Sequence, residues 1–216
     1  MDFPNLTSLL QGGTFYRRLK GQTLQTFDRP TVSIITKGYV KRYLIAKDGT
    51  VSVQSIYGPG YFFPLTAAFL ALFNQRLSTS DETYYYEAVT DIEYYSLSAE
   101  QFAAAAQQNP LVYKEVLYEA GRRLQSNIQQ LENMALKNAY RRVAHLLVYF
   151  AAQYGRPTEG GVQLVVPLTH QDIGDMLDLS RETVSREMAK LKTRGLIASD
   201  KTVIIPDVEA LKAIYN

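Results

Sequence analysis

The stretch Ser180-Arg181-Glu182-Thr183-Val184-Ser185-Arg186 decides how the C-terminal part of this chain folds. Ser180 carries a hydroxyl that can accept from the free N–H groups at a helix start, so it predicts a helix N-cap. Glu182 and Arg186 are four residues apart and leave such a helix on one face, which Arg181 borders. Because arginine can donate to guanine and glutamate can accept from cytosine, this helix end can read base edges in DNA.

The surrounding residues favour this interpretation over the alternative, a solvated face of paired charges. Thr169 predicts a second N-cap, with Asp172 placed close to a capping box. Gly174 puts no side chain where two helices would cross. Gly195 then predicts a helix end, and β-prone runs on both sides of the turn 199–201 predict a hairpin. Helix, turn, helix and hairpin together describe a winged helix-turn-helix.

Composition excludes several other classes of protein. The chain has 216 residues, of which 46% are hydrophobic, so a real core can form in one large or two modest domains. It has no cysteine, which excludes disulfides, iron–sulfur clusters and thiolate zinc sites. The net charge of +2 does not argue for nucleic acid, so binding DNA would need a local basic surface.

The chain also lacks signals for a membrane or for export. Its longest apolar run, near Leu65–Phe73, is far too short to span a bilayer. The start Met1-Asp2-Phe3-Pro4 has neither the basic residues nor the apolar core of a signal peptide. We therefore expect a cytoplasmic protein without membrane contact.

Residues 14–97 predict a β domain. Runs rich in Val, Ile, Thr, Tyr and Phe alternate with turn signals such as Asp48-Gly49 and Gly58-Pro59-Gly60. Many short strands indicate a sandwich or barrel, here a jelly roll, interrupted by a short helix or compact loop over Leu65–Gln75. The expected fold class is α+β, with this effector-like β roll in a domain over residues 1–108.

A long helix is expected to follow the β domain. Ser98 with Gln101 opens a helix through about Gln107, and Asn109-Pro110 opens another over about 110–136. Spacings of four and three alternate along it, as in a coiled coil. The seam consists of Tyr113, Leu117, Ala120, Leu124, Asn127, Leu131 and Met134.

A single helix packed on its own domain is the alternative explanation of this seam, but the strict alternation favours a parallel homodimer. Asn127 would fix the register or meet a ligand. We assign residues 109–137 to a dimerisation helix and hinge, and 138–216 to a DNA-binding domain. The latter begins with a helix from Ala139 to about Tyr154, followed by a flexible loop over 155–161 and a short strand over 162–167.

This order of parts resembles the Crp/Fnr family of bacterial transcription regulators over nearly the whole chain. The most specific motifs are Leu168–Gly174 and Ser180–Arg186, and Gly121–Gln125 is also similar. The resemblance implies two helices in successive major grooves of a palindrome, about 34 Å apart. It implies half-sites similar to TGTGA, although Ser185 matches the Fnr-like branch and leaves a TTGAT-like preference open. RNA polymerase is an implied partner.

The resemblance also implies roles for single residues. The residues that would contact bases are Arg181, Glu182, Ser185 and Arg186. The residues that would contact phosphate are Thr169, Gln171, Ser180 and Lys201. One departure is Asp178 in the helix-turn-helix turn, where the family usually has Gly; Asp tolerates the left-handed conformation better than most residues.

The β domain departs further from the cyclic-nucleotide-binding members. Those members carry a Gly-Glu-Leu stretch, whereas here 62–65, Phe-Phe-Pro-Leu, follows Gly60-Tyr61 without a Gly-Glu pair. Near residues 82–84, where the Arg-Ser pair would fall, the chain has Glu-Thr-Tyr. A buried phosphate needs a cation such as Arg, so we expect no cyclic nucleotide. Both histidines, His145 and His170, lie outside this domain, which argues against haem.

An aromatic-rich wall remains as the candidate effector site. Core packing is the alternative role of these rings, but phenol hydroxyls can also hold a small organic or aromatic ligand. The segments 63–65 and 86–89 are also similar to nitrogen-control members that sense 2-oxoglutarate, and other members act without a ligand. The candidate pocket residues are Phe63, Leu65, Tyr84, Tyr86, Arg122, Arg123 and Asn127.

Two other function classes stay open. A ligand-binding sensor dimer whose tail only mediates protein contacts would lack the steep salt dependence of DNA binding. A jelly-roll enzyme would need clustered His and carboxylate ligands on its strands, and residues 14–97 contain no His. We therefore expect no catalytic residue, no metal and no cofactor.

Overall fold

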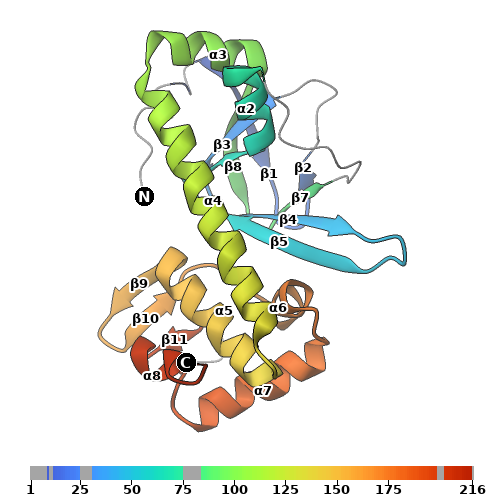
Figure 1. Ribbon diagram of the computed structural model, residues 1–216, viewed down its shortest axis with the longest axis vertical. Coiled ribbons are helices and arrows are strands. Elements are labelled where there is room, and N and C mark those ends of the chain that lie inside the picture. The colour runs from blue at the N-terminus through green and yellow to red at the C-terminus, as the bar shows by residue number, and fades with distance from the viewer. Residues whose placement is uncertain (1–8, 10–11, 25–30, 75–83, 199–201, 216) are drawn as a thin grey trace. The chain divides into compact units, whose positions relative to one another are not determined.

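The computed structural model describes residues 9, 12–24, 31–74, 84–198 and 202–215 (Figure 1). The chain forms two compact units, Met1–Leu124 and Gln125–Asn216. In the described residues, no helix is both long enough and apolar enough to cross a membrane.

The described residues of the first unit form two four-stranded antiparallel sheets, which confirms the predicted β roll. Their strand orders are β1-β8-β3-β6 and β2-β7-β4-β5. The strands are β1 Thr14–Arg18, β2 Thr23–Leu24, β3 Thr31–Lys37, β4 Val40–Ile45, β5 Val51–Tyr57, β6 Phe62–Phe63, β7 Tyr85–Ala88 and β8 Ile92–Ser98. The hairpin predicted at Asp48-Gly49 joins β4 to β5: Gly49 has φ +87°, and the Asp48 carboxylate accepts from the Thr50 N–H at 2.9 Å.

Helices cover one end of this roll. The interruption predicted over Leu65–Gln75 is a helix, α2 (Leu65–Phe73), and α3 (Ala99–Gln108) begins with the predicted capping box of Ser98 and Gln101. The long helix α4 spans Leu111–Ala135. The side chains that form the apolar core here include Val32, Phe62, Ala68, Leu97, Phe102, Val112 and Val116.

The second unit holds the C-terminal helices and a small sheet. The helix α5 (Ala139–Tyr154) has the predicted bounds, and Asn138 caps it by accepting from the Arg141 N–H at 2.9 Å. The other elements are β9 Gly155–Thr158, β10 Gly161–Leu164, α6 His170–Leu177, α7 Arg181–Thr193, β11 Ile204–Ile205 and α8 Val208–Lys212. The sheet order is β11-β10-β9.

The prediction of a flexible loop over residues 155–161 is wrong for Gly161, which begins β10, and for its first four residues. They form β9, which pairs antiparallel with β10. A Cβ at Gly155 would lie 2.2 Å from the Ala151 carbonyl oxygen and 2.5 Å from Val162, so glycine permits a tight exit from α5 directly into a strand. The Gly and Pro content that suggested a loop reflects this turn and the strand's edge position.

His145 is a packed residue of α5, as its sequence neighbours predict. It is 7% exposed, its Nδ1 shares a hydrogen bond with the Asn133 amide at 3.1 Å, and its ring meets the edge of Tyr215 at 4.8 Å. Burial lowers the pKa of His145, so the ring stays neutral at physiological pH. Its role in this unit is therefore to join α5 to its neighbours.

Candidate nucleic-acid interface

Two capped helices and a tight turn build the candidate interface. Thr169 and Asp172 form a complete capping box at the start of α6, with both hydrogen bonds at 3.0 Å. Ser180 caps α7 by accepting from the Thr183 N–H at 3.2 Å. Between the helices, Asp178 adopts the left-handed conformation with φ 51°. The predicted caps and turn are confirmed.

Gly174 allows the two helices to come close. A Cβ at this position would lie 2.6 Å from the Leu179 carbonyl oxygen, a distance that real Cβ contacts do not show. The Leu179 N–H in turn donates to the Gly174 carbonyl oxygen at 3.0 Å. The glycine therefore fixes how closely the chain turns from α6 into α7.

Apolar packing holds α7 in place. Val184, Met188 and Leu191 are buried on the side of α7 opposite the charged face, as predicted. Ile173 and Leu177 of α6 are also buried. Because α7 is anchored along this side, its other face is left for solvent or a partner.

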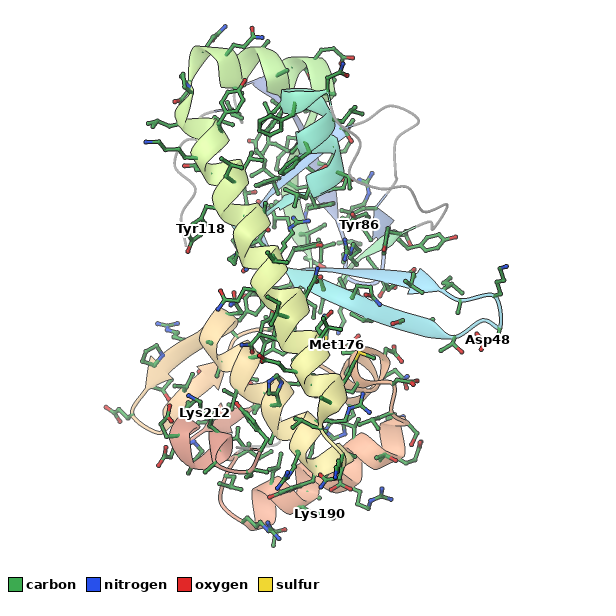
Figure 2. All side chains as sticks on the ribbon, viewed as in Figure 1. Asp48, Tyr86, Tyr118, Met176, Lys190 and Lys212 are labelled. Atoms are coloured by element: carbon green, nitrogen blue, oxygen red, sulfur yellow. The ribbon has the colours of Figure 1, made fainter. Side chains whose placement is uncertain are left out.

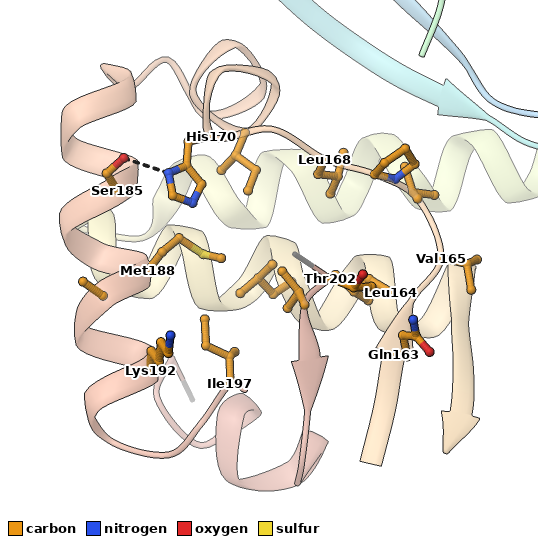
Figure 3. Close-up of a pocket in the computed structure, with 16 residues that line it drawn as sticks. Gln163, Leu164, Val165, Leu168, His170, Ser185, Met188, Lys192, Ile197 and Thr202 are labelled. Atoms are coloured by element: carbon orange, nitrogen blue, oxygen red, sulfur yellow. Dashed lines mark hydrogen bonds between the residues drawn. The ribbon is translucent and has the colours of Figure 1, made fainter. Parts of the chain in front are cut away.

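The charged face of α7 is exposed. Arg181, Glu182 and Arg186 are all solvent-accessible, and the structure brings them together at the N-terminal half of the helix. Ser185 lies between them and is half-buried, because its hydroxyl shares a 2.7 Å hydrogen bond with Nδ1 of His170 (Figure 3). Ser185 is therefore occupied within the protein in this state, while the other three side chains are displayed.

The side chains expected at phosphates lie at the starts of the two helices. Thr169, Gln171 and Ser180 are exposed there, where free backbone N–H groups and the helix dipole favour an anion. Gln171 also donates to the Asp175 carboxylate at 2.6 Å. Lys201 lies outside the described residues. Ala198 and Ile204, which flank it in the sequence, form an antiparallel bridge.

Glu187 is a residue of this interface that sequence reasoning missed. Its side chain is 5% exposed, and its carboxylate accepts from Arg186 Nε at 3.1 Å and from Lys190 Nζ at 2.8 Å. Burial alone raises the pKa of Glu187, but the bonds and charges of Lys190 and Arg186 bring it below its usual value. The sequence pattern that could have indicated its burial is the spacing of this acid, three residues after Val184 and four before Leu191, which puts it on the apolar side of the helix.

A cavity of about 580 Å³ lies between α7 and the β strands of the same unit (Figure 3). Its walls are mostly apolar, and its polar lining groups include His170, Ser185, Lys192 and Thr202. Ser185, Met188, Ala189 and Lys192 contribute to it from α7. The cavity therefore borders the charged face of this helix.

The predicted seam of α4 is largely exposed. The exposed fractions are 57% for Leu117, 62% for Leu124, 67% for Leu131 and 70% for Met134. Ala120 is half-buried, and Asn127 is exposed. Tyr113 is instead partly buried, and it packs against the core of the first unit. Its ring and that of Phe73 meet edge to face, with their centroids 5.9 Å apart.

The candidate effector residues do not all come together. Phe63 and Tyr86 are buried and stack with ring centroids 4.8 Å apart, and Tyr84 lies under the Arg42 guanidinium at 4.6 Å. Leu65 packs instead against the separate apolar cluster around Phe102. Asn127 belongs to the second unit.

The two arginines of α4 in the first unit share a buried acid that sequence reasoning also missed. Arg122 and Arg123 both donate to Glu119, at 2.8 and 2.7 Å, and this carboxylate is fully buried. Arg122 also lies over the ring of Tyr61 at 3.9 Å. The expected arginines are therefore present at the roll, but they are partly neutralised by their own helix.

Comparison with known proteins agrees with this architecture. Residues 141–214 match the model of the Crp-like helix-turn-helix domain. The chain is 30% identical over 184 residues to the nitrogen fixation regulation protein FixK of Rhizobium meliloti, covering 84% of this chain and 77% of that protein. It is 28% identical over 209 residues to a CRP-like cAMP-activated global transcriptional regulator of Mycobacterium tuberculosis, covering 95% and 88%.

Solved structures show the same fold. A CooA mutant from Carboxydothermus hydrogenoformans has a TM-score of 0.79 at 20% identity, covering 100% of this chain and 96% of that chain. FixK2 from Bradyrhizobium japonicum has a TM-score of 0.75 at 21% identity, covering 94% and 98%. With the FixK relationship and the helix-turn-helix match, the chain belongs to the Crp/Fnr family of DNA-binding transcription regulators.

Proposed function

We propose that this protein is a cytoplasmic homodimer that reads a palindrome with TGTGA-like half-sites and works with RNA polymerase. The observation that carries the proposal is the face of α7, where Arg181, Glu182 and Arg186 are exposed on a helix fixed by its cap and its buried side. In a major groove, each arginine would donate to a guanine and the glutamate would accept from a cytosine amino group. Ser185 would join them after releasing His170.

Phosphate contacts would set the position of this helix on the duplex. Thr169, Gln171 and Ser180 are exposed at the helix starts, where their side chains and the backbone N–H groups suit phosphate oxygens. Lys201 would add a contact from the hairpin, as the family resemblance implies. These phosphate contacts would strengthen binding to any DNA, whereas the base contacts of the α7 face would determine which sequence is bound.

Dimerisation would run along α4. Leu117, Leu124, Leu131 and Met134 are each more than half exposed in one chain, and an apolar stripe of this kind is typical of a helix that pairs with another. The domain roles would be those of the sequence expectation: effector-like roll over 1–108, dimerisation helix and hinge over 109–137, DNA-binding domain over 138–216. The break between α4 and α5 at residues 136–138 would be the hinge.

The effector domain would take no cyclic nucleotide, although the mycobacterial relative is named as cAMP-activated. The segment after Gly60-Tyr61 begins with the buried Phe62 and Phe63 and contains no Gly-Glu pair of the kind that the binding members carry. A ligand of another kind would bias the dimer through unequal affinity for its DNA-ready and DNA-unready arrangements.

Selection of bound sites from random duplex DNA tests the proposal. The full-length protein should enrich two inverted half-sites whose centres are one helical turn apart, and its affinity should fall steeply as salt rises. Enrichment of no motif would contradict the proposal. A sensor dimer whose tail binds protein would show neither enrichment nor steep salt dependence.

A further inference from the structure

Two buried polar atoms inside the β roll lack a hydrogen-bond partner within the described part of the chain. They are the Nε of Arg42 on β4 and the hydroxyl of Tyr57 on β5. Tyr57 is 2% exposed, so water does not reach this hydroxyl from the surface. Buried donors are almost always satisfied in folded proteins, and two such atoms in one domain call for an explanation.

The strand register brings these atoms to one face of one sheet. Arg42 stands opposite Tyr86 in the β4–β7 pair, and Val40 stands opposite Tyr57 in the β4–β5 pair. Since side chains alternate along a strand, residues 40 and 42 share a face, and directly opposed residues share it too. Arg42, Tyr57 and Tyr86 therefore project to the interior, where the rings of Tyr57 and Tyr86 have centroids 6.5 Å apart. Figure 2 labels Tyr86.

Positive charge collects at the same place. The Arg123 guanidinium reaches from α4 to lie over the Tyr57 ring at 4.8 Å, and it also donates to the Phe62 carbonyl oxygen. Glu119 already serves both arginines of α4, so it does not neutralise Arg42 as well. Burial and the neighbouring Tyr57 raise the pKa of Tyr86 far above its usual value, so this hydroxyl stays protonated as a donor.

We propose that the roll binds the carboxylate of a small organic acid at Arg42, Tyr57 and Tyr86. A carboxylate only accepts hydrogen bonds, and its two oxygens suit the N–H of Arg42 and the phenol O–H of Tyr57. The stacked rings of Tyr57, Phe63 and Tyr86 form an apolar wall for the rest of the molecule. This site rests on the effector part of the proposed function and names its ligand class. Tyr57 belongs to the aromatic-rich wall expected from sequence, and Arg42 is the addition.

Thermal unfolding of the full-length protein with acetate, benzoate or succinate tests the site, because a ligand that binds only the folded state raises its unfolding temperature. At least one of these acids should stabilise the wild type, and its affinity should fall about tenfold or more in Arg42→Met, the loss expected when a charge-assisted bond is removed. Arg17→Met is the matched control, since it removes an exposed arginine of the same unit. It should keep the wild-type response.

Tyr57→Phe gives a second, independent readout. Without ligand its unfolding temperature should be equal to or above that of the wild type, because an unpaired buried hydroxyl has been removed. With ligand its response should be weaker. A purely structural role of Tyr57 would instead lower the unfolding temperature in both conditions.

Three results would overturn the proposal. They are no stabilisation by any of the three acids, an equal response in Arg42→Met, and an equal response to inorganic phosphate or sulfate at matched ionic strength. None of these measurements contains DNA. Failure of the carboxylate site is therefore distinguishable from failure of DNA reading, which the enrichment of sites reports.

Discussion

In the middle of α7, the buried carboxylate of Glu187 accepts from Nε of Arg186 and so controls where this guanidinium points. Neighbouring residues on a helix do not normally face each other, so Arg186 must turn toward Glu187 to make this bond. Its two terminal nitrogens are left for another acceptor pair, such as O6 and N7 of guanine. Glu187 is thus a positioning residue for the base contact proposed for Arg186.

Glu187→Gln should relax the choice of base pair at the position that Arg186 reads. We expect discrimination there to fall about threefold to tenfold, because part of a bidentate contact worth about 1–3 kcal/mol is lost. Binding to random DNA should change little. The measurement compares affinities for the selected site and for its single-base variants.

Glu209→Gln is the matched control, since Glu209 is an exposed acid of the same unit on α8. It should leave discrimination intact. Equal losses on every DNA sequence in Glu187→Gln would show that Glu187 only supports the fold.

The Glu187 carboxylate should also link stability to pH. The pKa of Glu187 is lowered in the folded protein. The ionised carboxylate therefore adds fully to the free energy of unfolding at pH values above its ordinary pKa of 4.5. This stabilisation is lost as the pH falls through the pKa that the group has in the folded protein. The gap in unfolding temperature between wild type and Glu187→Gln should therefore be widest near neutral pH and should narrow as the pH falls below 4.5. A gap independent of pH would contradict the ion-pair account.

The turn between the helices α6 and α7 depends on the absence of a side chain at Gly174. Gly174→Ala would place a Cβ against the Leu179 carbonyl oxygen, and a backbone atom yields poorly. We expect a loss of roughly 1–3 kcal/mol in the free energy of unfolding, measured with denaturant. Gly121→Ala on α4 is the control, because a Cβ there meets open space and alanine favours helix; it should be neutral or stabilising.

The apolar seam of α4 can be tested through its proposed role in dimerisation. Leu124→Asp should weaken dimerisation about tenfold or more, since a charge would enter an apolar contact, and operator affinity should fall with it. Gln125→Asp changes the neighbouring exposed position and should leave the dimer intact. Sedimentation gives the association constants. An unchanged dimer in Leu124→Asp would place the interface elsewhere.

Elements with local signals were predictable from sequence. The caps at Ser98, Thr169 and Ser180 are encoded within four residues, and the structure has all three. The strand β9 was not predictable, because its glycine and proline are characteristic of loops and its pairing partner makes it a strand. The helix α8 was also not anticipated.

In the candidate sites, the exposed charged face of α7 could be predicted from helix periodicity. The burial of the acids Glu119 and Glu187 could not. A charged residue is expected at the surface unless partners surround it, and only the folded chain shows those partners. Arg42 is a similar case, since its face depends on strand register. The sequence therefore predicts the exposed functional side chains better than it predicts the buried residues that position them.

In the proposed complex with DNA, the whole molecule acts as two copies of one reading helix on one palindrome. Neither the net charge of +2 nor the fold alone gives sequence-specific recognition, so in the proposed homodimer specificity would come from the α7 faces doubled by symmetry. Affinity should consequently depend on the spacing of the half-sites as well as on their sequence.

The most direct test is the affinity of Arg181→Ala and Arg186→Ala for the selected palindrome and for its single-base variants. Our expectation is that each variant loses about 1–3 kcal/mol on the preferred site and becomes indifferent at one base pair per half-site, a different pair for each arginine. An equal loss on the palindrome, on every base variant and on random DNA would contradict it, because the two arginines would then contact only phosphate.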